Sequence, residues 1–139
     1  MSQPIHEKSL IIIKPDAVQR NLIGEIVGRF EKKGLKIVGL KMMSVEDATL
    51  EEHYAHIKDK PFFPGIRDFM KSSPVVVIAL EGVNAISAIR LLVGPTKAWE
   101  ANAGTIRGDF SLSTSRSGAI FRTRRTVYIS ENRHRFCLR

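Results

Sequence analysis

The feature that most constrains the fold is a short apolar run, Val75 to Leu80, which follows directly after Pro74. The run is too short to cross a bilayer, and its Val and Ile residues favour a fully buried strand. Ser9 to Ile13 has the same character and ends at Lys14-Pro15. The chain is therefore expected to contain two buried strands, one near its N-terminus and one in its middle.

An amphipathic helix is predicted between these strands. Asn21 is a residue type that caps helices, and Gly34 is one that ends them. Between them the apolar residues recur at the helical spacing i, i+3, i+4, i+7: Ile23, Ile26, Val27 and Phe30. Ser44-Val45-Glu46-Asp47 matches a capping box, which predicts a second, shorter helix that runs through His56.

The remaining elements complete a regular order. Strands are expected at 35–43 and at Thr126 to Ser130, and helices at 65–71 and 83–93. This order is typical of a β-α-β-β-α-β ferredoxin-like α+β fold, an antiparallel sheet with helices on one face. Residues 1–139 fit a single domain, and residues 1–8 are expected to fray.

The basic charge is concentrated at the C-terminal end. Residues 116–139 contain seven Arg, no Lys and a single acid, Glu131, whereas residues 1–115 have 15 basic and 13 acidic side chains. A shifted reading frame, drift without constraint, an anion-binding extension and a merely solvated surface all fit residues 117–139. The single cysteine, Cys137, agrees with a reducing compartment, so we expect a cytoplasmic protein that does not enter a membrane.

The long segment 94–118 carries a candidate anion site. Gly104-Thr105-Ile106-Arg107-Gly108-Asp109-Phe110 encloses one arginine between two glycines. Glycine permits a close approach to the backbone, and guanidinium binds phosphate through a planar donor fork. With neither a P-loop nor a Gly-x-Gly-x-x-Gly motif, phosphate would have to be held by side chains, and each such residue could also be an ordinary solvated one. The candidates are Lys14, Arg90, Thr96 and Arg107.

Three segments together resemble the nucleoside diphosphate kinase family: Ile11 to Asp16, Lys60-Pro61-Phe62-Phe63, and Gly104 to Phe110. The resemblance runs without a gap from about 9 to about 116. It implies that Lys14, Arg90, Thr96 and Arg107 bind the phosphates of nucleoside di- and triphosphates, that Phe62 stacks on the base, and that Tyr54 lies beside the catalytic His. It also implies Mg²⁺ carried by the nucleotide and a tetrameric or hexameric homo-oligomer.

The resemblance fails where the family places its nucleophile. Family members have Asn-x-x-His there and pass the γ-phosphate through phosphohistidine to a nucleoside diphosphate, whereas this chain reads Arg116-Ser117-Gly118-Ala119-Ile120. An ungapped alignment puts Ile120 at the His position. An eight-residue insertion puts Tyr128 there instead, and this version is preferred for the strand character of Thr126 to Ile129.

Because neither alignment places a histidine at the nucleophile position, three functions remain possible. Isoleucine has no lone pair, and tyrosine would form an aryl phosphate that is too stable for a second transfer. The histidines present all lie outside the motif, and His53 and His56 are expected on an exposed helix surface; the four are His6, His53, His56 and His134. The chain is then a nucleoside diphosphate kinase, impaired as written and with no assigned catalytic residue, or an inactive nucleotide-binding or assembly-forming relative. An RNA-binding module ranks last, because the aromatic signature of such modules is absent.

Overall fold

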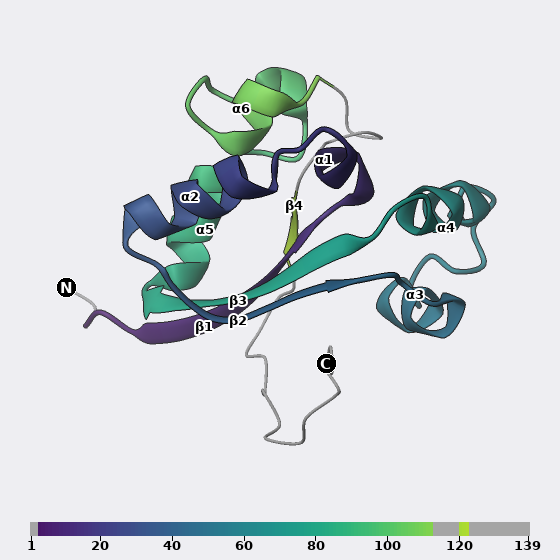
Figure 1. Ribbon diagram of the computed structural model, residues 1–139, viewed down its shortest axis with the longest axis horizontal. Coiled ribbons are helices and arrows are strands. Elements are labelled where there is room, and N and C mark those ends of the chain that lie inside the picture. The colour runs from purple at the N-terminus through teal and green to yellow at the C-terminus, as the bar shows by residue number, and fades with distance from the viewer. Residues whose placement is uncertain (1–2, 113–119, 123–139) are drawn as a thin grey trace.

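The sheet has four strands in the order β2-β3-β1-β4, and every neighbouring pair is antiparallel. The computed structural model describes residues 3–112 and, for their backbone alone, residues 120–122 (Figure 1). The strands are β1 (His6–Ile13), β2 (Lys36–Met43), β3 (Val75–Val83) and β4 (Ile120–Arg122). The ferredoxin-like α+β fold expected from the sequence is confirmed.

The first face of the sheet is covered by α2 (Ile23–Lys33) and α5 (Ala85–Val93), which lie side by side in Figure 1. Alternate residues of β1 and β3 point to this face, as the two-residue repeat of a strand requires. Phe30 of α2 and Ile89 of α5 are fully buried against them. Burial of each such side chain contributes about 1.5–3 kcal/mol.

The second face is covered in part by α3 (Asp47–His53) and α4 (Phe63–Lys71). Leu50 and Met70 from these helices are buried against the alternate residues of β1 and β3, among them Leu10 and Val77. The predicted helices on one face of the sheet are therefore α2 and α5. The short helices α3 and α4 also cover part of the opposite face. Both faces need cover because the central strands are apolar at every position from Leu10 to Ile13 and from Val75 to Leu80.

The predicted end of α2 is confirmed, whereas the predicted N-caps of α2 and α3 are wrong. Gly34 ends α2 in the left-handed conformation, at φ 99°. Asn21 does not cap α2: Leu22 is the N-cap, and Asn21 itself takes φ 59° in the turn after α1 (Pro15–Gln19). The capping box also fails, since Glu46 is the N-cap of α3 and makes no side-chain cap bond.

The start of the inner strand β1 differs from prediction, and the described sheet ends at β4. Residues 6–8, expected to fray, pair with β3, where His6 lies opposite Val83. The fourth strand of the described sheet is β4, which pairs with β1 so that Ile120 lies opposite Ile13, whereas the sequence analysis expected a strand at Thr126 to Ser130. Residues 126–130 lie outside the described part of the chain.

The segment after α5 is more ordered than a loop. It contains the 3₁₀ turn η1 (Ala98–Glu100) and the one-turn helix α6 (Ile106–Phe110), which lies beside α2 (Figure 1). Ile106 is fully buried in the first core cluster. Within residues 3–112, every helix is too short or too polar to span a lipid bilayer.

Candidate functional site

Lys14 is placed at the edge of the core by the strand that precedes it. Ile13 is fully buried, and Lys14 follows it as the N-cap of α1. Burial, then the positive charge of Arg107, lowers the pKa of Lys14 below its ordinary value of 10.5, while Asp16 opposes the shift. Burial and the positive charge of Arg107 thus both disfavour the charged ammonium of Lys14, and phosphate binding by these two residues stays a prediction.

Arg107 is held by the backbone of a separate element. Its Nη1 donates a hydrogen bond of 3.0 Å to the carbonyl oxygen of Gly94, the residue that ends α5. Burial lowers the pKa of Arg107 below its ordinary value of 12.5. The guanidinium thus connects α6 to the end of α5 and stays close to Lys14.

Glycines permit the close packing around Arg107. Gly94 has φ +86°, and a Cβ there would lie 2.8 Å from Oγ1 of Thr105. A Cβ on Gly108 would lie 2.0 Å from the carbonyl oxygen of Asn102, which is backbone and cannot rotate away. Both positions therefore require glycine for steric reasons.

The other two predicted phosphate ligands lie in the segment that holds Gly94. Arg90 and Thr96 are both exposed, on either side of that glycine. The amide of Gly94 donates to the carbonyl oxygen of Arg90 over 3.0 Å, so one turn of α5 separates them. Both residues lie near the C-terminal end of α5, where Arg107 donates its hydrogen bond to the carbonyl oxygen of Gly94, and both are exposed.

Tyr54 and His53 stand at the end of α3. Tyr54 is only 7% exposed, its burial raises the pKa of its hydroxyl, and its ring packs on Phe63 with 6.3 Å between centroids. The His53 ring meets the Tyr54 ring edge-on at 4.8 Å. Burial, then His56 and Lys14, lowers the pKa of His53, so its imidazole lies within electrostatic reach of Lys14.

The prediction for the two helix histidines was half right. His56 is exposed as expected, but His53 is partly buried. The sequence held a signal for this, because His53 is three residues after the buried Leu50 and therefore shares its face of α3. The partial burial of His53, beside Tyr54, is therefore a feature that the sequence analysis did not predict.

Phe62, the predicted base-stacking residue, is 56% exposed at the N-cap of α4. Its neighbour Phe63 is buried and anchors the helix in the second core cluster. An aromatic side chain fixed at a helix start with an open face suits stacking on a nucleobase.

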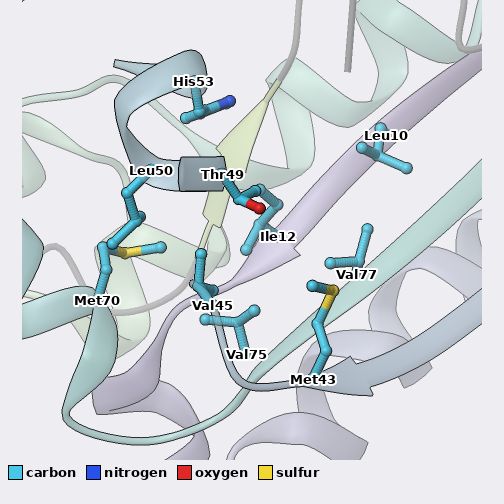
Figure 2. Close-up of a pocket in the computed structure, with 10 residues that line it drawn as sticks. All are labelled: Leu10, Ile12, Met43, Val45, Thr49, Leu50, His53, Met70, Val75 and Val77. Atoms are coloured by element: carbon cyan, nitrogen blue, oxygen red, sulfur yellow. The ribbon is translucent and has the colours of Figure 1, made fainter. Parts of the chain in front are cut away.

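A small apolar cavity of about 50 Å³ lies below α3 on the second face of the sheet, and Figure 2 shows its lining. Thr49 and His53 are the polar residues among those drawn; the others are aliphatic, such as Leu10, Met43 and Val77. This apolar lining does not suit phosphate, and neither Lys14 nor Arg107 is part of it.

The comparisons with known proteins agree on one family. The model of the nucleoside diphosphate kinase family matches residues 7–124. The chain is 57% identical over 107 residues to the nucleoside diphosphate kinase of Parabacteroides distasonis, which covers 77% of this chain and 70% of that protein. It is 50% identical over 111 residues to the enzyme of Archaeoglobus fulgidus, covering 80% of this chain and 74% of that one.

Solved structures give the same result. The halophilic nucleoside diphosphate kinase of Halobacterium salinarum in complex with CDP superposes with a TM-score of 0.81 at 41% identity, covering 92% of this chain and 82% of that one. A family protein from Babesia bovis gives a TM-score of 0.80 at 43% identity, covering 86% and 80%. The chain belongs to the nucleoside diphosphate kinase family.

Proposed function

We propose that this chain binds nucleoside di- and triphosphates, with their phosphates on Lys14 and Arg107. The observation that carries the proposal is the match of residues 7–124, which include both cations, to the nucleoside diphosphate kinase family. Burial, then the positive charge of Arg107, also lowers the pKa of Lys14. Like charges in partly desolvated surroundings are unfavourable by themselves, and a phosphate between them relieves the repulsion. A bound CDP in the Halobacterium salinarum relative supports a nucleotide as the ligand.

The remaining predicted residues fit around this pair. Arg90 and Thr96, exposed at the end of α5, would complete the phosphate contacts, and Phe62 would stack on the base. Tyr54 would line the site from α3. No group of three or more His, Cys, Asp or Glu side chains within residues 3–112 is arranged to hold a metal, so we assign Mg²⁺ to the nucleotide phosphates.

Phosphoryl transfer is the finer part of the proposal. In the family reaction a His nitrogen attacks the γ-phosphorus and passes the group to a diphosphate. The pairing of Ile120 with Ile13, the residue before Lys14, favours the ungapped alignment. Ile120 then stands at the nucleophile position without a lone pair, so we propose retained nucleotide binding with impaired transfer.

A homo-oligomer in the cytoplasm completes the proposal. β2 is an edge strand of the described sheet, and two of its large apolar residues, Leu40 and Met42, are 57% and 55% exposed. An edge strand with exposed apolar side chains favours association with another chain. This supports the assembly implied by the family, in which such an edge would be covered.

Calorimetric titration with Mg-ADP tests the binding site. We expect micromolar to millimolar affinity, and we expect Arg107→Ala to weaken binding by about 1.5–3 kcal/mol, the range for a hydrogen bond to a charged group. Arg67→Ala is the matched control, because Arg67 is a partly exposed arginine whose ion pair, to Asp68, lies within α4. Equal ADP affinity in wild type and Arg107→Ala would remove Arg107 from the site.

A further inference from the structure

We propose that Arg29 of α2 is a positioning residue that holds Arg107 in its phosphate-binding orientation. The inference rests on the proposed function, because it concerns the same nucleotide site. Arg29 is far from Arg107 in the sequence, but its guanidinium contacts the residues on both sides of it. Residues 104–110 are called the arginine segment below.

The contacts of Arg29 join the two ends of the arginine segment. Nη1 donates to the carbonyl oxygen of Gly104 over 3.1 Å, and Nη2 lies 2.7 Å from Oδ2 of Asp109. The guanidinium carbon also sits 4.7 Å from the centroid of the Phe110 ring. The Arg29 side chain is 22% exposed, so these contacts are partly shielded from water.

Asp109 closes the same segment from within. Its Oδ1 accepts a hydrogen bond of 2.9 Å from the amide of Gly104, whose carbonyl oxygen is already held by Arg29. The Gly104 amide and then Arg29 lower the pKa of Asp109 below its ordinary value of 3.8. Both backbone groups of Gly104 are therefore fixed by one charged pair.

The fixed ends determine where Arg107 points. Between them, the Thr105 hydroxyl accepts from the amide of Gly108 at 3.0 Å and donates to the carbonyl oxygen of Asn102 at 2.6 Å. Arg107 is at the centre of this short stretch and reaches Gly94 from it. Arg29 contacts the stretch rather than the phosphate ligands, so its effect on a nucleotide would pass through the placement of Arg107.

Arg29→Met tests this role because it keeps the length of the side chain and removes its charge. We expect faster hydrogen exchange at the amides of Gly104 and Gly108 with unchanged exchange in β1 and β3, and a loss of ADP affinity of about 10-fold. Arg29→Lys should recover part of the affinity through Asp109. Glu25→Gln is the control: it removes the other partner of Arg29, at 3.3 Å, and leaves the arginine segment intact.

A double-mutant cycle separates positioning from a merely structural effect. If Arg29 acts through Arg107, then Arg29→Met should cost no further ADP affinity in an Arg107→Ala background. An equal loss in both backgrounds, or unchanged ADP affinity in Arg29→Met, would overturn the proposal. Unchanged exchange at Gly104 would overturn the contacts themselves. If the wild-type chain binds no ADP, the proposed function is wrong, and so is the role of Arg29 in placing Arg107 for a nucleotide. Hydrogen exchange at Gly104 and Gly108 would still show whether Arg29 holds the arginine segment.

Discussion

The two sides of the proposed site are built differently. The phosphate side, formed by Lys14, the end of α5 and the arginine segment, is fixed by backbone hydrogen bonds, charged pairs and glycines that tolerate no side chain. The α3–α4 side is fixed by apolar contacts of residues such as Leu50, Phe63 and Met70 with the sheet. The ion pair between the two helices, in which Nζ of Lys71 lies 2.9 Å from Oδ1 of Asp47, is largely exposed.

The difference follows from what each side would have to recognise. Phosphate charge calls for donors in fixed positions, because a charge-assisted hydrogen bond depends on its geometry. A base offers an apolar π-face, which an exposed ring can contact in several orientations. We therefore expect the phosphate side to be intolerant of small changes and the α3–α4 side to be tolerant of them.

The largest difference should come from adding one methyl group on each side. Gly108→Ala drives a Cβ against the backbone of Asn102, and we expect it to destabilise the fold by about 3 kcal/mol. Gly65→Ala in α4 meets no atom within 4 Å, so we expect about 0.5–1 kcal/mol of stabilisation from helix propensity. Urea unfolding of both variants measures the contrast, and equal effects would contradict it.

The second prediction compares how variants on the two sides of the site bind two ligands, ADP and pyrophosphate. Phe62→Ala should weaken ADP binding by about 1–3 kcal/mol through lost stacking, with little change in stability because the ring is 56% exposed. Its affinity for inorganic pyrophosphate should be unchanged, whereas Arg107→Ala should weaken both ligands. Titrations of each variant with ADP and pyrophosphate provide the comparison. A loss of pyrophosphate binding in Phe62→Ala would mean that the two sides are not independent.

The smallest expected effect is the uptake of a proton by Lys14 when ADP binds. The pKa of Lys14 is lowered in the free protein, and bound phosphates would raise it by favouring the charged ammonium. At alkaline pH below 10.5, ADP binding should therefore take up a proton, and affinity should fall as the pH rises through the lowered pKa. Calorimetry in buffers of different ionisation enthalpy measures this uptake, and its persistence in Lys14→Met would assign the proton to another group.

The fold could be predicted from local patterns. The apolar runs of β1 and β3 and the helical spacing of α2 indicated the sheet and the helix that covers it. The arginine between two glycines indicated an anion site, which stays a prediction. Arg29 could not be placed in this way, because its proposed role depends on contacts with residues 104–110. Those contacts join residues distant in sequence that only the folded sheet brings together.

The location of β4 could not be predicted for a related reason. The run Thr126 to Ile129 has the stronger strand composition, yet Ile120 to Arg122 pairs with β1. An edge strand forms where a segment can make backbone hydrogen bonds with the unpaired side of a neighbouring strand. The composition of a segment does not specify the register of that pairing. The position of β4 matters for the proposed function, because Ile120 pairs with Ile13, the residue that precedes Lys14.

Phosphoenzyme formation tests the central claim, that the nucleotide site is retained and only the nucleophile is lost. Purified wild-type chain and the double variant Ser117→Asn with Ile120→His would each be incubated with ATP labelled at the γ-phosphate, and acid-labile protein-bound label would be counted. We predict acid-labile label on the variant. We predict that the wild type transfers phosphate between nucleotides at least ~10⁴-fold more slowly than an intact family member, the order of loss seen when a nucleophile is removed. Acid-labile label on the wild type would show that another histidine carries the phosphate, and no label on the variant would show that the site itself is not competent.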